Sequence, residues 1–216
     1  MKNAQIILQK VSKTIRGKII LDRIDLTLDE GGIYGFFGRN GSGKTMLLRA
    51  VAGLIRTEGS ISVFGKQISR DGSFPDSMGV VIEHPDMWGD RNAVENLKLL
   101  AEIKNEIGEK EIREALERVG LDPDDRRKVR TYSMGMKQKL AIAQAIMERP
   151  ELLLLDEPTN GLDDNAVTDV RRILREEKSR GCTILITTHQ KEDVIDLCDR
   201  TFRISEGRCE ETEAPV

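Results

Sequence analysis

The chain has 216 residues, of which 38% are hydrophobic and 33% are charged, a composition that predicts a globular protein with a heavily charged surface. Its 34 lysines and arginines against 37 acidic residues give a net charge of -3, which argues against bulk electrostatic binding to nucleic acid. No stretch approaches the roughly 20 apolar residues that span a bilayer, and the opening MKNAQIILQK lacks the apolar run of a signal peptide.

Apolar patterning predicts strands and one helix in the first part of the chain. Residues 6–11 are strand-like, residues 24–28 alternate with the period of a half-solvated strand, and residues 33–37 are typical of a strand covered on both faces. A helix is expected from Lys44 to about Gly53, where glycine provides a stop. Two more strands are expected, in GSISVFG and MGVVIE.

The middle of the chain is predicted to be helical. Asn92 and Glu95 fit a capping box at the start of one helix. A second helix has an apolar face formed by Ile112, Ala115, Leu116 and Val119. A third runs from about Met134 to Met147. We therefore expect a helical insertion at about residues 85–147.

Two apolar segments follow, LLLLD at 152–156 and TILITT at 183–188, and an amphipathic helix separates them. A strand, a helix and a strand in this order imply parallel pairing. The tail, EGRCEETEAPV, is expected to hold a last short strand and then a frayed acidic end. We predict one α/β domain over residues 1–216, with its core formed by residues 1–84 and 148–216.

The segment GRNGSGKT matches the pattern G-x-x-x-x-G-K-[ST]. Its glycines let successive backbone N–H groups turn inward around anionic oxygens, and the following helix adds the positive end of its dipole. The alternative, a glycine-rich turn with a solvated lysine, is disfavoured by the strand before the segment and the helix after it. The predicted nucleotide ligands are Gly38, Arg39, Asn40, Gly41, Ser42, Gly43, Lys44 and Thr45. Lys44 would meet the outer phosphates, and the hydroxyl of Thr45 would bind magnesium.

Two carboxylates, Asp156 and Glu157, stand where the apolar strand 152–156 ends. Ligands of open α/β sheets bind at the carboxyl ends of the strands. Asp156 is therefore a candidate magnesium ligand, and Glu157 a candidate general base for an attacking water. His189 follows the strand 183–188. A lone histidine is more often structural, but a neighbouring strand that carries Asp156 favours contact with a γ-phosphate.

Together these segments resemble the nucleotide-binding subunit of an ABC transporter, over nearly the whole chain. GRNGSGKT corresponds to Walker A, LLLLDE to Walker B, and PTNGLD to the D-loop, which contains Asp163. His189 falls on the switch histidine, and YSMGMKQKLAIAQAIM is similar to the signature segment and its helix. The resemblance implies a P-loop NTPase core with a mixed, largely parallel sheet, an N-terminal antiparallel β subdomain and an inserted helical subdomain.

The resemblance also implies an ATPase that uses ATP and Mg²⁺, with Glu157, His189 and Lys44 in catalytic roles. Ser133 and Gly135 would contact the γ-phosphate bound by a second subunit, in a head-to-tail dimer with either another copy or a paralogous ATPase subunit. Ser133 in the simpler role of a helix cap is compatible with this contact. The oligomeric state without nucleotide is left open.

Three positions depart from the family pattern. The signature reads YSMGM in place of LSGGQ. Glu83 replaces the usual glutamine, as in subunits that export bacteriocins, lantibiotics or bacitracin. Its carboxylate would reach magnesium or water and raise the demand for the metal, although a solvated strand-end glutamate is the alternative. Ile15 stands where the family stacks an aromatic ring on adenine, which predicts weak base selectivity.

The resemblance implies a membrane-spanning permease subunit as partner, and a cytoplasmic protein that lies on the inner face of the cell membrane. An odd number of cysteines, 3, without metal-ligand spacing agrees with a reducing compartment. Met87 and Trp88 lie where the family docks its membrane subunit, but a lone tryptophan is as often local core. Export of a drug or antimicrobial peptide is the expected function, with the cargo and the direction of transport unresolved. A non-transport ATPase of DNA repair or translation is the alternative, and no nucleic-acid partner is expected.

Overall fold

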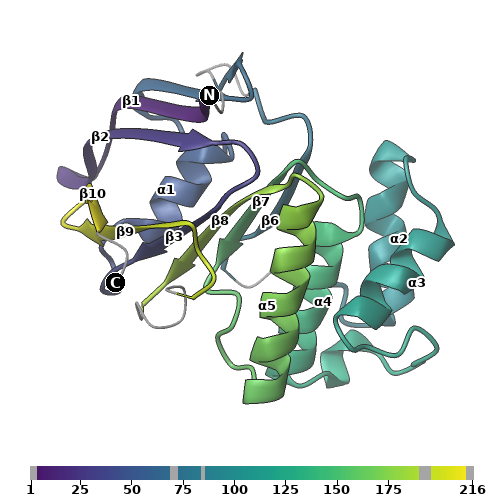
Figure 1. Cartoon of the computed structure of the whole chain (residues 1–216). Helices are drawn as coiled ribbons and strands as arrows, with labels where there is room; N and C mark the ends of the chain where they lie inside the picture. Colours follow the sequence, from purple (N-terminus) through teal and green to yellow (C-terminus); the bar gives the residue numbers. More distant parts are fainter. Residues whose placement is uncertain (1–3, 69–72, 84–85, 190–195, 213–216) are drawn as a thin grey trace.

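The computed structural model describes residues 4–68, 73–83, 86–189 and 196–212, which build two β-sheets and the helices around them (Figure 1). The first sheet is antiparallel and has the order β2-β1-β4-β5. Its strands are β1 (Ala4–Ile15), β2 (Lys18–Asp29), β4 (Glu58–Val63) and β5 (Lys66–Gln67). This sheet is the predicted N-terminal antiparallel β subdomain.

The second sheet has the order β10-β9-β3-β8-β7-β6, and all of its pairings are parallel except that between β9 and β10. Its strands are β3 (Ile33–Phe37), β6 (Met78–Val81), β7 (Leu152–Asp156), β8 (Thr183–Thr188), β9 (Arg200–Ser205) and β10 (Arg208–Thr212). β7 and β8 each have a strand on both sides and are almost wholly buried, which agrees with their mainly apolar sequences. The predicted fold class is confirmed.

The helices lie on both sides of the second sheet (Figure 1). They are α1 (Lys44–Val51), α2 (Ala93–Lys104), α3 (Glu109–Arg118), the 3-10 helix Val129–Thr131, α4 (Met134–Ile146) and α5 (Asp164–Ser179). Asn92 and Glu95 form the predicted capping box of α2. The chain runs through α2, α3 and α4 between β6 and β7. The exact limits of a helical insertion stay a prediction.

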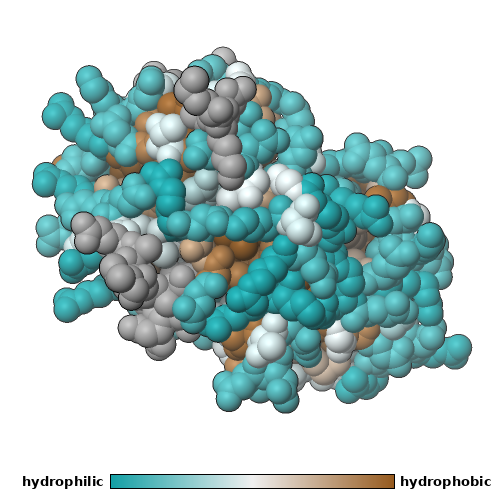
Figure 2. Space-filling view, viewed as in Figure 1, coloured by the Kyte–Doolittle hydropathy of each residue, from teal (hydrophilic) through white to brown (hydrophobic). Residues whose placement is uncertain are grey.

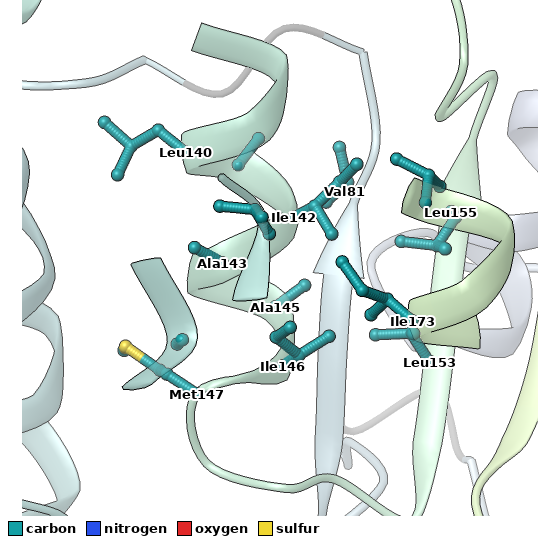
Figure 3. Packing of buried hydrophobic residues seen from close by; sticks show 14 of the residues in the cluster. Val81, Leu140, Ile142, Ala143, Ala145, Ile146, Met147, Leu153, Leu155 and Ile173 are labelled. Carbon is teal, nitrogen blue, oxygen red and sulfur yellow. The ribbon is translucent and has the colours of Figure 1, made fainter. Parts of the chain in front are cut away.

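A large apolar core joins α4 to the sheet (Figure 3). Ile142 and Ile146 of α4 are fully buried, and they face side chains of β6, β7 and α5. The backbone of β6 comes very close to α4, because a Cβ atom on Gly79 would lie 1.9 Å from the carbonyl oxygen of Ala145. Glycine is therefore required at this crossing.

Several strands differ from the sequence-based expectations, and the short strand β5 was not among those expected. β1 and β2 are longer than expected, because register shifts along their pairing break the alternation of apolar and polar residues without ending the strands. β9 was not expected, because its sequence RTFRIS mixes arginines with the buried residues Phe202 and Ile204. Its place beside β3 provides the apolar contacts that local sequence does not reveal.

The face shown in Figure 2 is mostly hydrophilic, as the charged composition predicts. Within the residues that the structure describes, no helix is long and apolar enough to cross a bilayer. The cysteines at positions 182, 198 and 209 are free, and burial raises the pKa of each thiol to about 12. These thiols are therefore protonated and poorly reactive at neutral pH.

Candidate nucleotide site

The glycine-rich segment connects the carboxyl end of β3 to the first turn of α1. Gly43 caps this helix with a φ of 113°, and glycine has no side chain that could accept a hydrogen bond from the first turn. A Cβ atom on Gly43 would lie 2.7 Å from the carbonyl oxygen of Ile20. The backbone N–H groups of the first turn are thus left for an anion, at the positive end of the helix dipole.

Lys44 is only 5% exposed although it carries a charge. Its Nζ atom donates to the carbonyl oxygens of Gly38 at 2.9 Å and Arg39 at 3.3 Å. The same atom lies 3.7 Å from Oε1 of Glu157. The ammonium group is thus held between the glycine-rich segment and the carboxylate that follows β7.

The hydroxyl of Ser42 provides an independent sign of a ligand. Its Oγ atom is buried and has no hydrogen-bond partner among the residues that the structure describes. A buried hydroxyl without a partner costs roughly 1–3 kcal/mol, so it calls for an acceptor or donor from outside the protein. A phosphate oxygen would accept this hydrogen bond.

Thr45 and Asp156 are brought together from positions far apart in the chain. The Thr45 hydroxyl donates to Oδ2 of Asp156 at 2.8 Å. The other carboxylate oxygen accepts a hydrogen bond from the hydroxyl of Thr187. Hard oxygen donors of this kind, a hydroxyl and a carboxylate, fit Mg²⁺, which usually takes one or two protein ligands and completes its shell with water and phosphate.

Glu157 lies at the centre of the remaining predicted catalytic groups. Its carboxylate is 3.6 Å from Nδ1 of His189, and Asn160 donates to Oε2 at 3.5 Å. Because β8 pairs with β7, the histidine lies beside the strand that carries Asp156, as expected. The backbone of Glu157 has a φ of 48°, which is uncommon for a residue other than glycine and recurs at functional sites.

A cleft of about 690 Å³ adjoins this group. Its wall is formed by Lys18, Ile19, Ile20, Gly38, Arg39, Asn40, Gly41, Ser42, His189 and the segment 203–207. Ile19, which is 57% exposed, thus supplies an aliphatic surface that the sequence did not single out. Ile15 ends β1, is 39% exposed and pairs with Lys18 across the hairpin. Its contact with a base stays a prediction.

The signature residues lie apart from this cleft wall. Ser133 caps α4 and accepts a hydrogen bond from the N–H of Met136 at 3.2 Å, so its expected capping role is confirmed. A Cβ on Gly135 would lie 3.4 Å from the carbonyl oxygen of Gly161, next to the D-loop. Asp163 caps α5 through the N–H of Ala166 at 2.8 Å. The roles of these residues toward a second subunit stay predictions.

Glu83 also lies at the end of its strand, but its carboxylate pairs with Arg49 of α1 at 2.9 Å. The Glu83 side chain is 61% exposed, and such exposed pairs contribute only about 0–1 kcal/mol. The pair would therefore break readily if a metal or a partner competed for the carboxylate. A metal contact of Glu83 stays a prediction.

Sequence reasoning missed several polar contacts of the site. Gln138 of α4 is 8% exposed and donates to the carbonyl oxygen of Pro158 at 3.1 Å, which ties α4 to the residue after Glu157. Thr187 and Arg49 were missed as well. Each of these three residues contacts a segment distant in the sequence, so local sequence does not reveal the contact. For Gln138 alone there was a signal, a polar residue within the apolar face of its helix.

Known proteins are similar to this chain in sequence and in fold. The sequence model of the ABC transporter family matches residues 21–160. The chain is 50% identical over 207 residues to the ABC transporter ATP-binding protein YybJ of Bacillus subtilis, with 95% of each chain covered. It is 39% identical over 191 residues to the bacitracin transport ATP-binding protein BcrA of Bacillus licheniformis, covering 87% of this chain and 62% of that protein. The dimeric ATP-binding cassette MJ0796 with ADP and Pi has the same fold, with a TM-score of 0.87, 22% identity and coverage of 98% and 99%.

The phosphate-binding segment and the strand-end carboxylates, joined across a mainly parallel sheet, define a P-loop nucleoside triphosphatase. Within that class the chain belongs to the ABC transporter family, in which it is an ATP-binding subunit and an ATPase.

Proposed function

We propose that this chain hydrolyses ATP to power the export of a drug or an antimicrobial peptide through a separate membrane subunit. The observation that carries the ATPase chemistry is the convergence of Lys44, Asp156 and Glu157 on one end of the sheet. Support for the cargo class comes from BcrA and from the lantibiotic transport ATP-binding protein SrtF of Streptococcus pyogenes, which is 35% identical over 202 residues.

The glycine-rich segment would hold the phosphates of ATP. The Lys44 ammonium would exchange its carbonyl acceptors for the outer phosphates, and the Ser42 hydroxyl and the N–H groups of α1 would bond to phosphate oxygens. Thr45 and Asp156 would hold Mg²⁺, Glu83 would approach it, and the metal would neutralise charge on the phosphates. Phosphoryl transfer depends mainly on such positioning and charge stabilisation.

Glu157 would act as the general base. It accepts a proton from the attacking water, whose oxygen forms a bond to the γ-phosphorus while the bond to the β,γ-bridging oxygen breaks. His189 contacts the same carboxylate and would bond to the γ-phosphate. Ser133 and Gly135 of a second copy, or of a paralogous subunit, would close the site from the other side in a head-to-tail dimer. Asp163 and its loop would lie at that interface.

A second surface is suited to the membrane subunit. A groove of about 480 Å³ is lined by Asp86, Met87, Gly89, Val129, Arg130, Met134, Lys137 and Gln138. Beside it Trp88 is 46% exposed. Its backbone N–H donates to the buried side chain of Asn96, and its backbone carbonyl oxygen accepts a hydrogen bond from the same side chain. An exposed aromatic ring on a rigid backbone is a typical anchor of a protein interface. Docking there would place the subunit at the inner face of the cell membrane.

We expect Trp88→Ser to lower the affinity for the membrane subunit by roughly tenfold or more, because the loss of a tryptophan anchor costs about 2 kcal/mol. Co-purification of the tagged chain with the membrane subunit measures this effect. Ile103→Ser is the control, since Ile103 is 77% exposed near the end of α2 and is not among the residues that line this groove. Equal recovery of the membrane subunit with wild type and Trp88→Ser would exclude this surface.

The cargo is tested in antibiotic-sensitive bacteria that carry this chain together with its membrane subunit. We expect them to tolerate more bacitracin or lantibiotic than cells in which the chain carries Lys44→Ala. The difference is measured as the minimal inhibitory concentration, with a non-peptide antibiotic as comparison. Unchanged tolerance to the peptide antibiotics would exclude a peptide cargo, and unchanged tolerance to the non-peptide antibiotic as well would contradict the proposed cargo while leaving the ATPase assignment intact.

A further inference from the structure

The hydroxyl of Thr187 bonds to both residues that carry the strand-end carboxylates. Thr187 lies in the buried strand β8 and is 0% exposed. Its Oγ1 atom donates to Oδ1 of Asp156 and accepts the backbone N–H of Glu157 at 3.2 Å. The same N–H also bonds to the carbonyl oxygen of Thr187 at 3.1 Å. The hydrogen-bonding capacity of this buried hydroxyl is therefore used as both donor and acceptor.

This hydroxyl fixes the direction of the Asp156 carboxylate. The last torsion of an aspartate is broad, so a carboxylate with one hydrogen bond can turn. Here the Thr187 hydroxyl on β8 donates to Oδ1 of Asp156, and the Thr45 hydroxyl on α1 donates to Oδ2 of Asp156 at 2.8 Å. With both oxygens occupied, the carboxylate has one orientation, and Oδ2 faces the hydroxyl of the glycine-rich segment.

Packing alone does not require a hydroxyl at position 187. The three residues that precede it along β8, Ile184, Leu185 and Ile186, are buried and apolar. Valine has nearly the shape of threonine and would fill the same space with no polar group to satisfy. The N–H of Glu157 would keep its bond to the carbonyl of residue 187. The bond that depends on the hydroxyl alone is the one to Asp156.

We propose that Thr187 is a positioning residue of the ATPase reaction, which orients Asp156 for magnesium–nucleotide binding. The inference rests on the proposed role of Asp156. Loss of a side chain that orients a metal ligand typically lowers metal affinity or activity by about 10- to 100-fold.

The test compares Thr187→Val with Thr187→Ser, which retains the hydroxyl. For Thr187→Val we expect a roughly tenfold higher Mg²⁺ concentration for half-maximal binding of a fluorescent ATP analogue, and a kcat about tenfold lower with KM for ATP changed less than twofold. Thr187→Ser should have nearly wild-type values of both the Mg²⁺ concentration for half-maximal binding and kcat.

The matched control is Thr183→Val. It removes a buried hydroxyl at the other end of β8 that accepts a hydrogen bond from the backbone N–H of Gly31 at 3.0 Å. It should leave both readouts unchanged, and thermal unfolding monitors the fold of each variant.

Thr187→Val with wild-type Mg²⁺ dependence and kcat would overturn the inference, as would a serine variant no better than the valine variant. An equal effect of Thr183→Val would also overturn it, because the cause would then be lost stability. Asp156→Asn distinguishes failure of the proposed metal role of Asp156 from failure of the proposed role of Thr187. If Asp156→Asn and Thr187→Val both have normal Mg²⁺ dependence, the metal role of Asp156 fails. If Asp156→Asn is impaired and Thr187→Val is not, only the role of Thr187 fails.

Discussion

Lys44→Ala is expected to lower the affinity for ATP by roughly 100-fold or more, because each hydrogen bond to a charged group contributes about 1.5–3 kcal/mol and the ammonium offers several. Lys44 is 5% exposed and already faces the carbonyl oxygens of the glycine-rich segment, so it enters the bound state with little loss of side-chain freedom. Titration with a fluorescent ATP analogue, or calorimetry, measures the change.

The control is Lys110→Ala. The Lys110 side chain is 81% exposed on α3 and pairs with Glu114 at 3.7 Å, so its removal changes the net charge equally but leaves the site intact. Thermal unfolding of both variants shows whether the protein stays folded. An alanine variant at position 44 that binds ATP within threefold of wild type would remove Lys44 from the phosphate site.

The parts of the fold that the sequence predicts are those with local causes. β3, β7 and β8 begin and end as expected, because a strand covered on both faces is mainly apolar, and each of these apolar runs is short and bounded by polar or glycine-containing segments. Asn92 likewise caps α2 through contacts within one turn. In such elements the residues nearby in the sequence determine the local structure.

The parts that the sequence does not predict depend on contacts between distant segments. Thr187 is one threonine in TILITT, and the sequence does not show that its hydroxyl meets Asp156, 31 positions away. The pair of Arg49 and Glu83 connects α1 to the end of β6, and the interpretation of Glu83 as a metal ligand could not foresee this competitor. Ile19 lines the cleft because of the hairpin register, which bulges alter.

Glu157→Gln is expected to bind ATP and to hydrolyse it roughly 100- to 1,000-fold more slowly, since a positioned general base contributes about 10²- to 10⁴-fold. Binding should persist, because the glutamine keeps the size of the side chain and the phosphate ligands are other groups. The Lys44 ammonium lies 3.7 Å from this carboxylate, and neutralising the carboxylate frees the ammonium for phosphate. ATP affinity should therefore equal or exceed that of wild type.

Slow hydrolysis with intact binding should trap the head-to-tail dimer, which size-exclusion chromatography with ATP and Mg²⁺ detects as a shift to twice the mass. Phosphate release under saturating ATP measures turnover. Glu151→Gln is the matched control. Glu151 is an exposed glutamate just before the first residue of β7, and its replacement by glutamine changes the net charge by the same amount. It should behave as wild type in both assays. Full turnover by Glu157→Gln would assign the base to another group and leave His189, 3.6 Å away, as the next candidate to replace.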